Sequence, residues 1–278
     1  MASKRIIIKP RTSCLGADVS GIDLSKSLKE KDKKIIHSAW VEHKVLFFRD
    51  QHLTPEKHQA FAENFGLPQP AGFVPTLPDH PFVRRQEQPG KTKSLDIVWH
   101  ADDIFLPIPS KGSILYALDV PEQGGDTVWS DMQEAYQALS LPWQRFIEDL
   151  SAINVPNADL MEIVKRFGAE AFAKIYSDVP PVSQPVVRVH PESGEKSIFV
   201  NPLNTSSIEG LSKVESETVL NFLFRHCQRA EFQVRLSWLK GTVAFWDNRS
   251  TIHMGIADYG DSHRLMHRVA IADTQAPQ

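Results

Sequence analysis

Residue types that bind metal ions occur at two separate places in the sequence. His100 and Asp102 lie between the apolar segments 97–99 and 104–105, and His253 follows a predicted buried strand. Residues i and i+2 of an extended strand point to the same face, so His100 and Asp102 can offer an imidazole nitrogen and a carboxylate oxygen to one ion. An H-x-D pair alone is a weak signal, because such a pair is commonly a satisfied hydrogen bond.

His253 completes a ligand set of recognisable chemistry. Two histidines and one carboxylate on one face of a site, with the opposite face open, are the ligands of non-haem Fe(II) oxygenases. The open positions admit a bidentate co-substrate and oxygen, which a closed four-ligand zinc site excludes. Asp103 is a rival to Asp102, but the i+1 position points to the opposite face of a strand, so we predict Asp102 as the ligand.

Two arginines follow the second histidine. Arg264 and Arg268 are four residues apart in a predicted strand and therefore face the same side. A guanidinium stays charged when partly buried and binds a carboxylate through two hydrogen bonds, so this strand could hold two acids near the metal. The alternative for two such arginines is ion pairing with surface carboxylates.

Composition narrows the classes of protein. The 278 residues are 41% hydrophobic and 23% charged, with a net charge of -3, which disfavours disorder and binding to nucleic acid. The only cysteines, Cys14 and Cys227, cannot form a disulfide framework, so a metal must use histidine and carboxylate. The N-terminal residues do not match a signal peptide, and no apolar run is long enough to span a membrane. We therefore expect a soluble, cytoplasmic protein without nucleic-acid or membrane partners.

The elements that must position these residues can be read from the apolar pattern. A helix over 27–43 leads into a buried strand at 45–48, and Thr54 caps a second helix that Gly66 closes. Segment 67–89 has neither helical nor strand periodicity and is predicted to be a long loop. Segment 111–120 reads as a strand, and the turn Gly124-Gly125-Asp126 predicts a hairpin-like pairing with 127–129.

The second half of the chain is richer in strands. Helices are predicted at 132–139, 142–150, 159–172 and 216–228, and strands at 185–190, 197–200, 232–238, 242–246 and 265–272. Strands and helices do not alternate regularly and no glycine-rich fingerprint follows a strand, which excludes a Rossmann fold. The pattern favours an antiparallel sandwich or jelly roll in one domain. The remaining polar-context histidines, expected at the surface, are His37, His52, His58, His80 and His226.

The order of these motifs resembles the TauD/TfdA (taurine dioxygenase) family of Fe(II)- and 2-oxoglutarate-dependent dioxygenases. The resemblance spans nearly the whole chain and rests on segments 43–51, 99–102, 124–127, 185–191, 199–201 and 246–268. It implies that His100, Asp102 and His253 are iron ligands. It further implies that Thr127 and Arg264 hold the distal carboxylate of 2-oxoglutarate and that Arg268 meets an acidic group of the substrate; the two arginine roles could be exchanged.

The resemblance also implies an architecture and a reaction. The fold is expected to be mainly β with flanking helices, with a double-stranded β-helix (jelly roll) core. One domain over 1–278 is expected, with a substrate loop at 67–95 and a lid or a solvated insertion at 152–185. A homo-oligomer, dimer or tetramer, follows from the family. The enzyme would use Fe(II), 2-oxoglutarate and O2 to oxidise a C–H bond, releasing succinate and CO2.

Departures from the family pattern bear on the substrate. The loop at 67–75 lacks the histidine and tyrosine of sulfonate-using members, while Asp96 and Asn204 stand where an amide and an aromatic residue are frequent. If they face the site, these two residues suit a small acidic or zwitterionic compound better than taurine; surface positions are the alternative. Two alternative hypotheses remain. The protein is either a sulfonate- or alkylsulfate-cleaving enzyme of the family or a non-catalytic metal-binding protein of the same fold.

Overall fold

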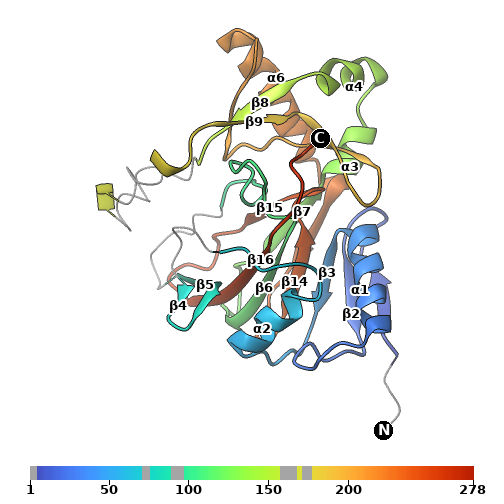
Figure 1. The fold of residues 1–278 in the computed structure, drawn as a ribbon, viewed down its shortest axis with the longest axis vertical. Helices are drawn as coiled ribbons and strands as arrows, with labels where there is room; N and C mark the ends of the chain where they lie inside the picture. Colours follow the sequence, from blue (N-terminus) through green and yellow to red (C-terminus); the bar gives the residue numbers. More distant parts are fainter. Residues whose placement is uncertain (1–4, 71–75, 89–96, 157–167, 171–176) are drawn as a thin grey trace.

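Two β-sheets that face one another form the centre of the molecule in the computed structural model (Figure 1). The structure describes residues 5–70, 76–88, 97–156, 168–170 and 177–278. The larger sheet has eight strands in the order β1-β2-β3-β14-β6-β16-β5-β4, and the smaller has three in the order β13-β7-β15. The pairings are antiparallel except that of β2 with β3. The protein is therefore mainly β, as expected, with helices around the sheets.

The bounds of the elements follow the chain closely. The strands are β1 (Ile7–Pro10), β2 (Ala17–Ser20), β3 (Val45–Phe48), β4 (Thr76–Leu77), β5 (His80–Gln88), β6 (Gly112–Asp119), β7 (Thr127–Asp131), β8 (Ser151–Asn154), β9 (Val182–Pro185), β10 (Val187–Val189), β11 (Lys196–Ile198), β12 (Thr205–Ile208), β13 (Gln233–Leu236), β14 (Val243–Asp247), β15 (Thr251–Gly255) and β16 (Arg264–Ile271). The helices are α1 (Glu30–His43), α2 (Pro55–Ala62), α3 (Met132–Gln137), α4 (Leu141–Glu148) and α6 (Lys213–Cys227), with a 3-10 turn at Ala230–Phe232.

Alternation along the central strands of the large sheet produces two buried faces. The outer face carries Ile114, Phe245 and Val269, which pack against helices α1 and α2. Trp40 of α1 stacks on Phe245, with ring centroids 4.4 Å apart. Both faces of these strands are thus apolar, which is why the sequence shows continuous hydrophobic runs here.

The inner face of the large sheet packs against the three-stranded sheet. Leu115, Ala244 and Met266 point inward and share a cluster with Trp129 of β7 and Val234 of β13. This packing holds strands β15 and β16, which carry His253, Arg264 and Arg268, on facing sheets. A third apolar cluster joins α3, α4 and α6 to strands β8 and β12 at one end of the molecule (Figure 1).

The prediction of a structureless loop after residue 67 was wrong in part. Strand β5 is nine residues long and pairs with β16, with Arg84 opposite Arg268 and Gln86 opposite Met266. Its inward positions carry polar side chains, so the apolar alternation that marks a strand is missing from the sequence. Residues 71–75 and 89–95 of the predicted substrate loop at 67–95 lie outside the described residues.

The predicted hairpin at Gly124-Gly125 was wrong, and the predicted insertion at 152–185 is described only in part. Strands β6 and β7 do not form a hairpin, because β6 pairs with β14 and β16 while β7 pairs with β13 and β15. The Gly124-Gly125 turn therefore carries the chain from one sheet to the other. Half of the predicted lid or insertion at 152–185 lies outside the described residues, and strands β8 and β9 at its two ends pair with one another. None of the helices in the described ranges is long and apolar enough to cross a membrane.

Candidate metal and co-substrate site

The structure brings His100, Asp102 and His253 together between the two sheets. Asp102 Oδ1 lies 3.8 Å from His100 Nε2 and 3.9 Å from His253 Nε2. The candidate ligand atoms all lie within 4.8 Å of one another, and the three residues are buried. In the described part of the chain this is the single group of three such side chains that could hold a metal ion.

The local backbone at this site differs from the expected strand. His100 forms one isolated bridge with His253, its backbone N–H and C=O bonding those of His253 at 2.9 and 2.7 Å. Asp102 lies in the turn that follows, and Asp103 has a φ of 59°. The alternation argument for an H-x-D strand was therefore wrong here, although the turn still brings Asp102 to the same place.

Backbone contacts define which nitrogen of His100 is free to bind an ion. His100 Nδ1 lies 2.7 Å from the Val98 carbonyl oxygen, which can only accept, so Nδ1 carries the proton. The lone pair of Nε2 then points toward Asp102, the arrangement that metal-binding histidines require. Burial, followed by the neighbouring His100, lowers the pKa of His253 well below its ordinary value, so the His253 imidazole is neutral.

Asp102 remains a carboxylate despite its burial. Arg268 Nη1 donates to Asp102 Oδ1 at 2.7 Å, and the Ser113 hydroxyl donates to Oδ2 at 2.7 Å. Burial alone would raise the pKa of Asp102, but the neighbouring Arg268 charge and the hydrogen bond from Ser113 oppose it, and that pKa lies below its ordinary value. A charged carboxylate beside two neutral imidazoles is the donor set that a divalent cation needs.

These distances fit one metal ion. Two ligand atoms that are each about 2.1 Å from the same ion lie roughly 3 to 4 Å apart, which is the separation of Oδ1 from both Nε2 atoms. The same separations are too long for hydrogen bonds. The donor set of two imidazoles and one carboxylate oxygen therefore suits Fe(II), with further positions left for other ligands.

The residues predicted to hold 2-oxoglutarate line a cavity beside the triad. Thr127, His253, Arg264 and Arg268 share this small cavity between the sheets, together with Gln86 of β5. Arg264 and Arg268 are each 6% exposed, so the alternative of surface ion pairs does not hold. The cavity places two guanidinium groups within reach of acidic groups beside the candidate metal ligands.

A tryptophan that the sequence did not single out orients Thr127. The indole N–H of Trp238 donates to Thr127 Oγ1 at 2.9 Å, and an indole nitrogen can only donate. Thr127 is therefore an acceptor in this contact and keeps its own hydroxyl proton for another partner. An inward-facing tryptophan in the alternating segment 232–238 was the available signal.

Comparison with known proteins identifies the family. The family model described as "Taurine catabolism dioxygenase TauD, TfdA family" matches residues 7–270. The chain belongs to the TauD/TfdA family. As a member of it, the protein is a 2-oxoglutarate-dependent dioxygenase, an oxidoreductase that uses Fe(II) and O2.

Relatives of this TauD/TfdA protein cover most of its length. It is 35% identical over 275 residues to an alkylsulfatase from Acinetobacter baylyi, covering 97% of this chain and 86% of the relative. It is 33% identical over 270 residues to an alpha-ketoglutarate-dependent sulfate ester dioxygenase from Pseudomonas putida, covering 95% and 89%. The crystal structure of a taurine dioxygenase from Burkholderia xenovorans superimposes with a TM-score of 0.84 at 33% identity, covering 98% and 92%.

Two further residues of this TauD/TfdA protein, Asp96 and Asn204, were predicted from the sequence as substrate contacts. Asp96 lies outside the described residues. The Asn204 amide donates to the Val155 carbonyl at 3.1 Å, and Asn204 is buried at the turn before β12. His58 and His226 were expected at the surface and are buried instead, and Nε2 of each ring bonds a backbone carbonyl.

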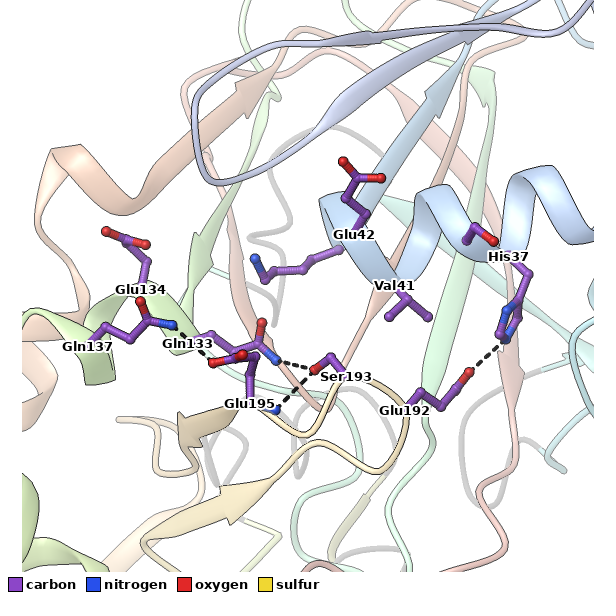
Figure 2. Close-up of a pocket in the computed structure, with 11 residues that line it drawn as sticks. His37, Val41, Glu42, Gln133, Glu134, Gln137, Glu192, Ser193 and Glu195 are labelled. Carbon is purple, nitrogen blue, oxygen red and sulfur yellow. Dashed lines mark hydrogen bonds and ion pairs between the residues drawn. The ribbon is translucent and has the colours of Figure 1, made fainter.

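A larger pocket lies away from the triad, between α1, α3 and the turn that follows β10 (Figure 2). Figure 2 shows two carboxylates of this turn reaching neighbouring elements: Glu192 toward His37 of α1, and Glu195 toward Gln137 of α3. The Glu192 contact is 2.8 Å long, and Arg249 Nη1 donates to the other oxygen of Glu192 at 2.7 Å. Glu192 is thus occupied by protein partners on both of its oxygens.

Proposed function

We propose that the protein hydroxylates a C–H bond of a small acidic organic substrate. The overall reaction consumes the substrate, 2-oxoglutarate and O2, and yields the hydroxylated product, succinate and CO2. The observation that carries this proposal is the convergence of His100, Asp102 and His253 next to a cavity lined by Thr127 and two buried arginines. Bound Fe(II) with 2-oxoglutarate and O2 would supply the oxidising power.

In this proposal the triad residues hold the metal. His100 Nε2, Asp102 Oδ1 and His253 Nε2 would be the ligands, since they face one another at ligand-to-ligand distances. The Val98 carbonyl keeps the proton of His100 on Nδ1. Three ligands leave the remaining positions of an octahedral ion for co-substrate and oxygen.

Thr127 and Arg264 would bind the distal carboxylate of 2-oxoglutarate. Trp238 occupies Thr127 Oγ1 as a donor, so the Thr127 proton is available to a carboxylate oxygen. Arg264 lines the same cavity and would donate to the other oxygen. The surrounding tryptophans and Leu115 exclude water from this contact and strengthen it.

Arg268 would bind the acid of the substrate. It lies at the cavity and already contacts Asp102 Oδ1, so an anion held by Arg268 would lie close to the metal ligands. This closeness orients the substrate for attack at a carbon near its acidic group. Asp96 and Asn204 are proposed as further substrate contacts on sequence grounds alone.

We also propose that residues 1–278 form one domain with a double-stranded β-helix core. The support is the pairing pattern, in which the eight-stranded and three-stranded sheets face one another through a shared apolar cluster. Strands adjacent in the sequence, such as β6 and β7, lie on opposite sheets, which is typical of jelly rolls.

A sulfate ester is the second candidate substrate, and the comparisons favour it specifically. Two relatives above 30% identity are named for alkyl sulfate or sulfate ester chemistry. A sulfate ester is an acid that Arg268 could bind, as it could a carboxylate. Hydroxylation of the carbon that carries the ester oxygen would release sulfate and an aldehyde.

Substrate-dependent succinate release tests the proposal. The purified protein with Fe(II), 2-oxoglutarate and O2 is offered carboxylates, amino acids, aryloxyalkanoates, phosphonates, sulfonates and alkyl sulfates, and products are identified by mass spectrometry. We expect succinate release with at least one acid and none from His253→Ala. Sulfate release would support the second candidate. The absence of succinate release with every acid would contradict the role of Arg268 and favour a non-catalytic protein.

A further inference from the structure

A fully buried serine forms a hydrogen bond with the carboxylate of Asp102, the proposed acidic ligand of the triad. Ser113 of β6 donates its hydroxyl proton to Asp102 Oδ2 at 2.7 Å, and Ser113 is 0% exposed. The other oxygen, Oδ1, faces both imidazole Nε2 atoms and accepts from Arg268 Nη1 at 2.7 Å. The two oxygens of Asp102 therefore have different environments before any ion is considered.

The direction of the hydrogen bonds behind Ser113 follows from a donor that cannot accept. The indole N–H of Trp246 donates to Asn248 Oδ1 at 2.8 Å. The Asn248 amide nitrogen must then be the donor to its other partners, Ser110 Oγ at 3.1 Å and Ser113 Oγ at 3.4 Å. Because Ser113 accepts from Asn248, its own proton is directed to Asp102.

We propose that Trp246, Asn248 and Ser113 form a directed hydrogen-bond chain that makes Asp102 a ligand through Oδ1 alone. This inference rests on the proposed function of the triad. Placing both carboxylate oxygens on one ion would compete with the hydrogen bond that Ser113 donates to Oδ2, so this hydrogen bond favours binding through Oδ1. A carboxylate bound through one oxygen leaves the position that a bidentate co-substrate needs. Ser113 and Asn248 are therefore positioning residues that act through Asp102.

Two serines that contact Asn248 provide a variant and a matched control for testing the hydrogen-bond chain. Ser110 and Ser113 are both buried and both accept from the same Asn248 amide, but only Ser113 contacts Asp102. Co(II) is titrated into the full-length protein without 2-oxoglutarate, and its visible absorption is followed. Ser113→Ala should weaken Co(II) binding by roughly 10- to 100-fold, the usual effect of losing a contact to a metal ligand. Ser110→Ala should change it by less than about threefold.

Asn248→Asp tests the direction of the chain while leaving the serine hydroxyl in place. A carboxylate at position 248 still accepts from Trp246 but can no longer donate, so Ser113 would turn its proton toward residue 248 and away from Asp102. We expect Asn248→Asp to weaken Co(II) binding as much as Ser113→Ala does. The double variant should be no worse than either single variant, because both remove the same contact.

The outcomes separate this inference from the proposed function. If wild type and His253→Ala bind Co(II) equally, the triad is not the metal site and the proposed function fails. If wild type binds at the triad but Ser113→Ala matches it, or Ser110→Ala weakens binding equally, only the hydrogen-bond chain is overturned. Thermal melting of each variant verifies folding, and Ser113→Ala alone decides the question if Asn248→Asp does not fold.

Discussion

Two buried clusters of histidine, aspartate and arginine lie in the part of the chain that the structure describes, and their difference indicates what makes one of them a candidate metal site. The first is the triad with Arg268, and the second joins His190, Asp247 and Arg249 at the end of β14. Both aspartates are buried and both have a pKa held below the ordinary value by charged neighbours that outweigh burial. Residue types and burial therefore do not distinguish the two clusters.

Both oxygens of Asp102 also accept hydrogen bonds, from Arg268 and Ser113, so the position of the proton on the histidine is what distinguishes the two clusters. Both oxygens of Asp247 are occupied: Arg249 donates through its backbone N–H, Nε and Nη2 at 2.8, 2.9 and 2.6 Å, and His190 Nε2 lies 3.1 Å away. His190 Nδ1 accepts from the backbone N–H groups of Glu192 and Ser193, so its proton is on Nε2. His100 has the opposite tautomer, because its Nδ1 faces a carbonyl. A histidine with a proton on the nitrogen that faces the carboxylate cannot share an ion with it.

The largest expected effect separates the two aspartates by metal binding. Asp102→Ala and His253→Ala should each abolish turnover and the weak visible absorption band that Fe(II) and 2-oxoglutarate produce together under anaerobic conditions. His253→Ala should keep the fold, whereas Asp102→Ala also removes a buried ion pair with Arg268 and should lower the free energy of unfolding. Anaerobic spectra and thermal melting check this, and a band that survives in His253→Ala would contradict the triad assignment.

Asp247→Ala should lower the stability of the protein and leave its metal binding unchanged. Removing this carboxylate leaves the Arg249 guanidinium buried, and breaking a buried ion pair from one side costs about 3 to 5 kcal/mol of unfolding free energy. Co(II) affinity of the folded protein should stay close to that of wild type. Urea unfolding and Co(II) titration measure the two quantities, and a stable variant that has lost metal binding would reverse our assignment of the clusters.

Substitution of the two cavity arginines should affect two different reactants, 2-oxoglutarate and the prime substrate. Losing a charge-assisted contact in a buried site costs roughly 2 to 5 kcal/mol, on the order of a hundredfold or more in binding. Arg264→Ala should raise the KM for 2-oxoglutarate, and Arg268→Ala the KM for the prime substrate. Steady-state kinetics with each reactant varied in turn will show whether the roles are exchanged.

His58, another buried histidine, gives the smallest expected effect, and burial is the main cause of its shifted pKa. Burial lowers the pKa of His58 to about 3, while the unfolded chain has a histidine pKa of about 6.5. The unfolded state therefore binds the proton first, and stability falls as the pH falls from about 6.5 toward 3. At pH 5 the resulting loss of unfolding free energy, relative to a pH well above 6.5, is about 2 kcal/mol. His58→Asn should flatten the pH dependence of urea unfolding in that range, and an unchanged slope would argue against it.

Much of the fold could be predicted because apolar periodicity reports local structure. The strand at 45–48, the helix capped by Thr54 and the hairpin around 191–194 were confirmed. Strand β5 was missed because its inward side faces the cavity and is polar, with Arg84 and Gln86 in place of apolar residues. The wrong hairpin at Gly124-Gly125 shows that a turn sequence does not reveal which strand its neighbour will join.

The sequence by itself determined the kinds of donors available and the order of the motifs, which together indicated iron, 2-oxoglutarate and the TauD/TfdA family. Only the tertiary structure decided which histidines present a lone pair and which a proton. That choice depends on whether a carbonyl or an N–H group of the backbone lies beside Nδ1, as it does for His100 and His190 in opposite senses. The support of Asp102 by Ser113 is likewise tertiary, because a turn and a separate strand must meet to form it.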